Sequence, residues 1–214
     1  MIAEDPKSAE IIRPILRGRD IKRYGYYFAD LWLINTHNGI KEKGIKPVNI
    51  EDYPAVKKHL DSYYDSLKKR FDKGDTPYNL RNCAYMDDFN KQKITWGNLN
   101  LNASFTFAPP GYFINAPSAL IVSDSNFLLV YLNSKVADYY IRSLGVSRNG
   151  GYFEYKPMFV EKLPIPLIFS DVNVEFRVQN LLRKKVESFE NEINQFIFKI
   201  FDLTDEEMRF IDSQ

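Results

Sequence analysis

The chain has 214 residues, of which 44% are hydrophobic and 15% aromatic, and its formal net charge is +1. This composition excludes an intrinsically disordered chain, and the sequence contains neither a run of roughly 20 apolar residues nor a signal-peptide pattern. Cys83 is the only cysteine, which excludes an intrachain disulfide and a cysteine-based metal cluster. We therefore expect a cytoplasmic protein without a membrane partner, built as one domain or as a domain with an appendage.

The charges are unevenly distributed along the chain. Residues 1–100 carry 18 Lys and Arg against 14 Asp and Glu, a balance of +4. Residues 101–170 carry 5 against 4, and residues 171–214 carry 6 against 10, a balance of −4. A basic front part and an acidic tail permit a nucleic-acid-binding face on the front part, although they do not require one.

The first predicted elements are a basic loop, a strand and a helix. The segment "LRGRDIKRYG" (16–25) places four cations close to the start of the chain. Residues 26–35 are rich in aromatic and β-branched side chains and predict a strand. Apolar residues at helical spacing predict a helix after Asp52, which is expected to cap it, and the helix is expected to end before Gly74.

The middle of the chain alternates short strands with turns and then gives a second helix. Apolar runs broken by proline and glycine predict strands around 92–97, 104–107, 111–114 and 119–123. The spacing of aromatic and aliphatic residues predicts a helix over roughly 125–144, which Gly145 ends.

The last part of the chain predicts a hairpin, a connector and two helices. A Gly150–Gly151 turn leads into a short aromatic strand, and "KLPIPLI" (162–168) predicts an extended connector because each proline fixes φ and removes a donor. An apolar stripe predicts one long helix over about 173–201, and "TDEE" (204–207) is a capping box for a last helix. Together these elements predict an α+β fold.

Few residues suggest catalysis or metal binding. His37 and His59 do not lie in a metal-ligand pattern, and Walker A, GxSxG and GxGxxG motifs are missing. The pair Asp87–Asp88 invites a metal site, but "DDFNKQK" only loosely resembles a nuclease pattern, and we favour a solvated turn. We therefore expect no catalytic residue and no metal site.

Three segments gather side chains that suit nucleic acid. They are Arg17–Tyr24, Tyr78–Tyr85 and Arg142–Tyr155, and each combines Arg, Lys or Asn with aromatic residues. Arginine can donate two hydrogen bonds to guanine, asparagine can bridge adenine N6 and N7, and aromatic rings pack on bases. Surface charge and core aromatics explain each segment taken singly, but three in one chain favour a nucleic-acid partner.

A longer series of segments resembles a known family. The segments "ILRGRDIKRYGY", "DYPAVKKHLDSYYDSLKKRFDKGDTPYNLRNCAYMDDFNKQKITWGNL", "GYFINAPSALIV", "LLVYLNSKVADYYI" and "GGYFEYKPMFVEKLPIP" occur in that order. Over roughly residues 12–168 the chain resembles the TaqI-like C-terminal specificity domain. This is the target-recognition region of type IIG restriction–modification enzymes and related adenine-specific DNA methyltransferases.

The resemblance implies that the catalytic parts lie elsewhere. In the family, an upstream domain transfers a methyl group from S-adenosylmethionine to adenine N6, and some members add a nuclease domain that uses Mg²⁺. The segment "APPGYF" (108–113) lacks the leading Asn or Asp of the methyltransferase tetrapeptide. We therefore expect a recognition module for double-stranded DNA, without a cofactor of its own, that has been separated from an upstream methyltransferase domain of the same polypeptide.

The resemblance also divides the chain and assigns roles to residues. Residues 1–168 would form the recognition domain, and residues 169–214 a helical extension whose apolar stripe packs on that domain or forms a homodimer. Expected phosphate contacts are Arg17, Arg19, Lys22, Arg23 and Lys156. Expected base-reading residues are Tyr78, Arg81, Asn82, Lys93, Arg148 and Asn149, the last two beside a flexible turn at Gly150 and Gly151.

Other functions stay open at this point. The chain could be a protein-interaction or oligomerisation module of the same enzyme, or a domain like a specificity subunit that acts in trans. A stand-alone nuclease that uses Asp87 and Asp88 is a third possibility, although we expect no cleavage by the chain alone.

Overall fold

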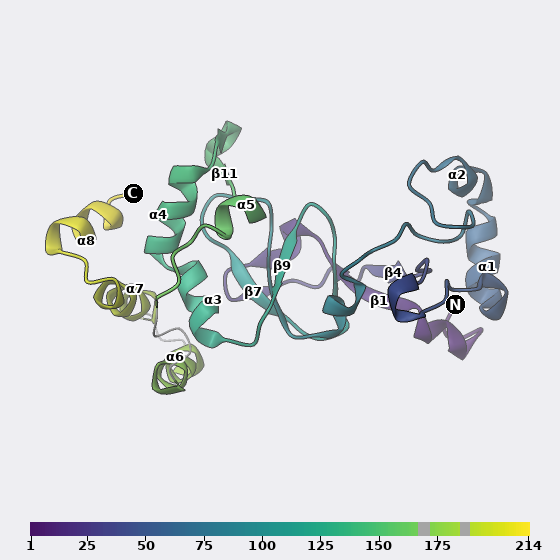
Figure 1. The fold of residues 1–214 in the computed structure, drawn as a ribbon, viewed down its shortest axis with the longest axis horizontal. Helices are drawn as coiled ribbons and strands as arrows, with labels where there is room; N and C mark the ends of the chain where they lie inside the picture. The colour runs from purple at the N-terminus through teal and green to yellow at the C-terminus, as the bar shows by residue number, and fades with distance from the viewer. Residues whose placement is uncertain (167–171, 185–188) are drawn as a thin grey trace. The chain divides into compact units, whose positions relative to one another are not determined.

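The computed structural model describes residues 1–166, 172–184 and 189–214, and its described part forms two compact units (Figure 1). Unit 1 comprises residues 1–15, 30–90 and 111–113, and unit 2 comprises residues 16–29, 91–110 and 114–214. The predicted α+β class is confirmed, because helices and short strands both contribute to the fold. The expected division at residue 168 stays a prediction, and the compact units divide the chain at other places.

Unit 1 holds two short helices and an antiparallel strand pair. Ile12 to Pro14 of β1 pair with Ile34 to Trp32 of β4, and a small core forms around Ile11, Ile50 and Val56. The elements that begin in this unit are β1 (Ile12–Leu16), β4 (Trp32–Ile34), α1 (Pro54–Asp61), α2 (Tyr64–Lys69) and β8 (Phe113–Ile114).

Two predictions for the front of the chain need correction. The strand expected over 26–35 is limited to β3 (Gly25–Tyr26) and β4, because Asp30 adopts a left-handed φ of 53° that interrupts an extended chain. The helix expected from Asp52 to Gly74 is two helices, α1 and α2. Pro54 occupies the first turn of α1, and Tyr53 rather than Asp52 is the capping residue. The Ser62 hydroxyl donates to the His59 carbonyl at 2.6 Å where α1 ends.

Unit 2 is built on a three-stranded antiparallel sheet in the order β7-β5-β9. Trp96 of the central strand pairs with Phe105 on one side and Ala119 on the other. A hairpin of β2 and β3 and a second sheet, in the order β10-β11-β6, complete its strands. The bounds are β2 (Ile21–Lys22), β3 (Gly25–Tyr26), β5 (Lys93–Trp96), β6 (Leu99–Asn100), β7 (Phe105–Ala108), β9 (Ala119–Val122), β10 (Ser147–Arg148) and β11 (Tyr152–Glu154). The four strands predicted in the middle of the chain are therefore confirmed.

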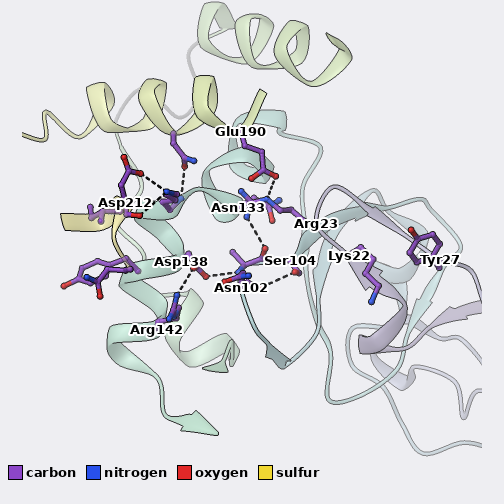
Figure 2. Close-up of a pocket in the computed structure, with 16 residues that line it drawn as sticks. Lys22, Arg23, Tyr27, Asn102, Ser104, Asn133, Asp138, Arg142, Glu190 and Asp212 are labelled. Carbon is purple, nitrogen blue, oxygen red and sulfur yellow. Dashed lines mark hydrogen bonds and ion pairs between the residues drawn. The ribbon is translucent and has the colours of Figure 1, made fainter. Parts of the chain in front are cut away.

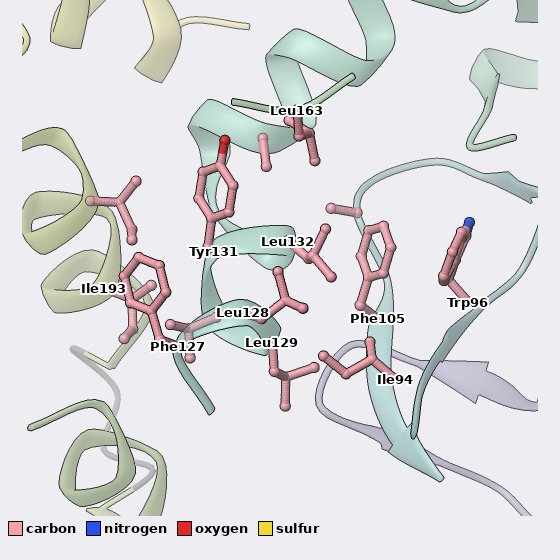
Figure 3. Close-up of a cluster of buried hydrophobic side chains, with 14 of the residues drawn as sticks. Ile94, Trp96, Phe105, Phe127, Leu128, Leu129, Tyr131, Leu132, Leu163 and Ile193 are labelled. Atoms are coloured by element: carbon pink, nitrogen blue, oxygen red, sulfur yellow. The ribbon is translucent and has the colours of Figure 1, made fainter. Parts of the chain in front are cut away.

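Helices cover this sheet and close the main core (Figures 1 and 3). Their bounds are α3 (Asn126–Asn133), α4 (Lys135–Leu144), α5 (Pro157–Val160), α6 (Val172–Lys184), α7 (Phe189–Ile200) and α8 (Asp205–Asp212). Phe105 from the sheet, Phe127 and Tyr131 from α3 and Ile193 from α7 are buried in one cluster. The apolar side of α7 therefore packs within unit 2.

A buried amide covers the edge of strand β7. The Asn133 side chain, which is fully buried at the end of α3, accepts from the Phe105 main-chain N–H at 2.9 Å. It also donates to the carbonyls of Phe105 and Leu129, each at 3.0 Å. Because β7 is an edge strand, this side chain takes the place of a further strand.

Two long predicted helices are each a pair of helices. The helix expected over 125–144 divides at Ser134, whose extended backbone and hydroxyl cap the start of α4, whereas Gly145 ends it as predicted. In the segment expected to be one helix over 173–201, the Arg177 guanidinium lies 4.6 Å from the centre of the Phe196 ring. Residues 19 positions apart in one helix would be about 28 Å apart, so α6 and α7 cannot be continuous.

The remaining predictions for the tail are largely confirmed. Thr204 and Glu207 form the expected capping box of α8. Residues 163–166 of the predicted extended connector are neither helix nor strand. Residues 167 and 168 of that connector lie outside the described residues.

Candidate nucleic-acid interface

An open hollow of about 510 Å³ in unit 2 has several side-chain amides in its lining. Four asparagines contribute to it, together with two cations and one tyrosine ring: Asn98, Asn100, Asn102, Asn115, Arg19, Lys22 and Tyr152. Among the described residues that line it, none is Asp or Glu. We call it the amide hollow. Its lining offers both donors and acceptors, and its charge is positive.

Two glycines in the lining of the amide hollow lie in close contact. A Cβ atom on Gly97 would lie 3.2 Å from the Gly18 carbonyl oxygen, and one on Gly18 would lie 3.4 Å from the Gly97 Cα. The segment before Arg19 and the segment before Asn98 therefore approach each other through their backbones. This close contact places side chains from both segments around one opening.

Two of the predicted phosphate-binding cations border this hollow with free charge. Arg19 is exposed and has no ion-pair partner in the described part of the chain. Lys22 is also exposed, and its Nζ donates only to the Arg19 carbonyl at 2.8 Å. Neither side chain forms an ion pair with a carboxylate of the described residues, although the charge of Arg19 is felt at Asp20. Both side chains can therefore meet an incoming anion.

The other two cations of the basic loop have internal partners. The Arg17 guanidinium donates to the buried carboxylate of Asp20 at 2.9 and 2.7 Å, and this contact holds the pKa of Asp20 below its usual value. Arg23 donates to Glu190 at 2.7 Å, and its guanidinium lies near the Tyr24 ring. Arg17 and Arg23 thus differ from the expectation, because each side chain stabilises the fold of unit 2.

The β10–β11 hairpin presents the second group of predicted residues. Asn149, Gly150 and Gly151 are exposed at its tip, and both glycines adopt a φ of +79°. Arg148 and Lys156 share the buried carboxylate of Glu154, to which Arg148 Nε donates at 2.8 Å and Lys156 Nζ lies at 2.7 Å. Two cations against one carboxylate leave a positive charge at the base of the hairpin.

A second hollow, of about 690 Å³, adjoins the amide hollow and shares Lys22, Asn102 and Ser104 with it (Figure 2). Figure 2 shows that most of its charged side chains point toward one another. The ion pairs are Arg23 with Glu190, Lys135 with Asp212, and Arg142 with Asp138. Because these charges are internally neutralised, this second hollow is less suited than the amide hollow to a polyanion.

In unit 1, Arg81 is the predicted base-reading residue with a free side chain. Arg81 is exposed, and no ion pair joins it to another described residue. The Tyr78 hydroxyl donates to Asp61 at 2.5 Å, and this contact raises the pKa of Tyr78 to about 12. Asn82 is exposed, but its side-chain oxygen accepts from Asn38 at 2.8 Å.

Lys93 is a correction to the predicted site. It is fully buried in β5, and its Nζ donates to the carbonyls of Lys91 at 2.8 Å and Pro109 at 2.9 Å. Burial lowers the pKa of Lys93 to about 8. A side chain held in this way cannot reach a base edge.

The acidic pair in unit 1 is engaged as well. Asp87 forms an ion pair with Lys43, and Asp88 has contacts of its own. Across residues 1–166, 172–184 and 189–214, the structure has no group of three or more His, Cys, Asp or Glu side chains placed to hold a metal ion. None of the helices in these ranges is long and apolar enough to cross a bilayer.

Comparison with known proteins decides the family. The family model of the TaqI-like C-terminal specificity domain matches residues 13–165. The chain belongs to this family. No curated protein matches the chain.

One solved structure that matches is the type IIL restriction–modification enzyme MmeI in complex with DNA, with a TM-score of 0.67 and 11% sequence identity. The match covers all of this chain and 32% of that one, so this specificity domain spans about a third of the length of MmeI. At this identity the likeness is one of fold.

Sequence reasoning missed the asparagines of the amide hollow. Their signal is the alternating "NLNLN" of residues 98–102, in which β6 pairs with β11 and places Asn100 opposite Phe153. The Asn100 amide itself donates to the Gly97 carbonyl at 2.7 Å. Asn98, Asn102 and Asn115 have no side-chain hydrogen bond to another described residue, which leaves their amides for a ligand.

Proposed function

We propose that this chain recognises double-stranded DNA sequence-specifically, as the target-recognition part of a restriction–modification enzyme. The observation that carries the proposal is the amide hollow, which combines unpaired cations with free amides and has no carboxylate in its described lining. A polyanion with hydrogen-bonding base edges matches both properties. Membership of the specificity-domain family supports the same conclusion.

The two kinds of side chain have separate tasks in this proposal. Arg19 and Lys22 contact phosphates, which fixes the register of the protein on DNA but selects no sequence. Asn98 and Asn115 read base edges, and adenine is their best partner because one amide can bond to N6 and N7 together. The hairpin tip at Asn149 adds a further contact.

The chemistry belongs to the parent enzyme. We infer that an upstream domain of the same polypeptide methylates adenine N6 with S-adenosylmethionine, and that a nuclease domain with Mg²⁺ accompanies it if the parent cleaves. The segment "APPGYF" lacks the residue that would bind the adenine amino group, which supports a chain that directs catalysis without performing it.

Salt-dependent binding to a duplex tests the phosphate contacts. Each phosphate that a cation neutralises adds about 0.9 to the slope of log K against log salt. The double variant Arg19→Ala/Lys22→Ala is therefore expected to reduce the slope by about 1.8, measured by fluorescence anisotropy with a labelled duplex. Lys199→Ala is the matched control, because Lys199 is an exposed lysine of α7 away from the hollow.

The salt slope of the double variant shows whether the amide hollow contacts DNA. An unchanged slope in the double variant would remove the amide hollow from the interface. Selection of bound duplexes from a random pool then tests the reading residues. Asn98→Ala and Asn115→Ala are each expected to relax the preference at one base pair, by about 1–3 kcal/mol of discrimination.

A further inference from the structure

Phe71 in unit 1 is completely exposed, with a relative accessibility of 104%. It follows Arg70, the residue that ends α2, and lies in the loop that leads to Arg81. Single exposed apolar residues are common on protein surfaces, so exposure alone assigns no role. The loop around Phe71 supplies the further evidence.

The loop that carries Phe71 is firmly held. The Arg70 guanidinium donates to the carbonyls of Pro77 at 3.0 Å and Asn79 at 3.1 Å. Asn79 is buried, and its amide donates to the Val48 carbonyl at 2.9 Å. Gly74 has no space for a side chain, since a Cβ there would lie 2.5 Å from the Asn38 side chain. These contacts fix the backbone on both sides of an exposed ring.

Two free cations lie just before Phe71 in the sequence. Lys68 and Lys69 are exposed and form no ion pair with another described residue. Residues 64–73 carry four Lys and Arg against two Asp, and Asp61 and Asp75 lie on either side of this range. Lys73 and Leu80 form a β-bridge, so the segment after Phe71 lies beside the segment that contains Arg81. The ring thus lies in sequence after two free lysines, on a segment that runs beside the one containing Arg81.

We infer that Phe71 is an aromatic wedge that inserts between neighbouring base pairs of DNA while Lys68, Lys69 and Arg81 contact the flanking phosphates. The inference rests on the proposed function and adds a second mode of contact to it. Apolar wedges that partly unstack a base step require a side chain that protrudes and a backbone that does not yield. Phe71 meets both requirements. The cations favour DNA over a protein partner.

Paired and mismatched duplexes test the wedge. A mismatch weakens stacking, so a protein that inserts a ring binds a duplex with one central mismatch more tightly than the same duplex fully paired. Phe71→Ala is expected to weaken binding to the paired duplex about tenfold and to abolish the preference for the mismatch. Phe71→Trp retains a ring and is expected to keep both. Thermal unfolding checks that each variant is folded.

A matched control and the contrary outcomes complete the experiment. Phe176→Ala removes another exposed phenylalanine, which is 63% accessible on α6, and is expected to change neither affinity nor preference. Wild-type binding by Phe71→Ala, or weaker binding with the mismatch preference intact, would refute the wedge while leaving DNA recognition in place. If the wild-type chain binds neither duplex, the proposed function itself fails.

Discussion

Replacing Asn133 with leucine tests whether one amide holds the edge of the main sheet. The substitution keeps a side chain of similar size but removes the acceptor for the Phe105 N–H and the donor for two carbonyls. The Phe105 carbonyl keeps a bond from the Tyr24 main-chain N–H at 3.0 Å. The loss therefore falls mainly on one buried N–H.

The expected magnitude follows from this count of partners. A buried donor left unsatisfied costs about 1–3 kcal/mol, and the lost bonds to carbonyls add to it. We expect Asn133→Leu to lower the free energy of unfolding by about 2–3 kcal/mol, measured by urea denaturation. The dependence of that free energy on urea concentration should be unchanged. Asn191→Leu, on the exposed side of α7, should change it by no more than about 0.5 kcal/mol. If the leucine variant were as stable as the wild type, the hydrogen bonds of Asn133 to the edge strand β7 would not stabilise the fold.

The variant Asn133→Asp adds a pH dependence with a defined sign. Burial raises the pKa of a carboxyl at this position above its unfolded value of about 3.9. The folded state then binds more protons than the unfolded state above that pH, so the stability of this variant should fall as the pH rises. Denaturation midpoints at acidic and neutral pH measure this directly, and a midpoint independent of pH would contradict burial of the side chain.

Two further predictions concern carboxylates that organise unit 2. Arg17→Ala should lower the melting temperature, because Asp20 loses its ion-pair partner. The dependence of DNA affinity on salt concentration should stay at the wild-type value. A reduced salt dependence would show that Arg17 contacts DNA phosphates. Glu175 accepts from the Asn126 and Phe127 N–H groups at the start of α3, and although burial alone would raise the pKa of Glu175, these hydrogen bonds outweigh it and lower the pKa. The ionised Glu175 therefore stabilises the fold above about pH 4.3, and this stabilisation is lost as the pH falls below that value. In Glu175→Gln, the melting temperature should depend less on pH in the acid range. A pH dependence equal to that of the wild type would contradict the role of Glu175.

Sequence patterns predicted the helices and strands of this fold better than the points at which one helix ends and the next begins. The strands of the main sheet were found because apolar runs between proline and glycine are a local signal. The breaks at Ser62 and Ser134 were missed, since apolar spacing continues through both while each hydroxyl bonds to the backbone. Local side-chain bonds of this kind compete with a helix and leave little trace in the hydrophobic pattern.

The candidate site was predictable only where its residues are neighbours in the sequence. The exposed tip at Gly150 and Gly151 could be read from two adjacent glycines. The amide hollow could not, because it joins segments near residues 18, 97 and 115 that are far apart in the sequence. Lys93 was misassigned because a lysine in a strand usually points to solvent, whereas here two carbonyls retain it inside.

The contact between Gly18 and Gly97 has a consequence for how recognition could diverge. Asn98 and Asn115 do not belong to the buried core clusters, so these two lining residues can be exchanged without a change in the core. A side chain at either glycine would instead press against the facing segment, which would have to shift by a few tenths of an ångström. Base preference can therefore change through substitutions at Asn98 and Asn115, whereas Gly18 and Gly97 have to remain glycine to keep the present shape of the hollow.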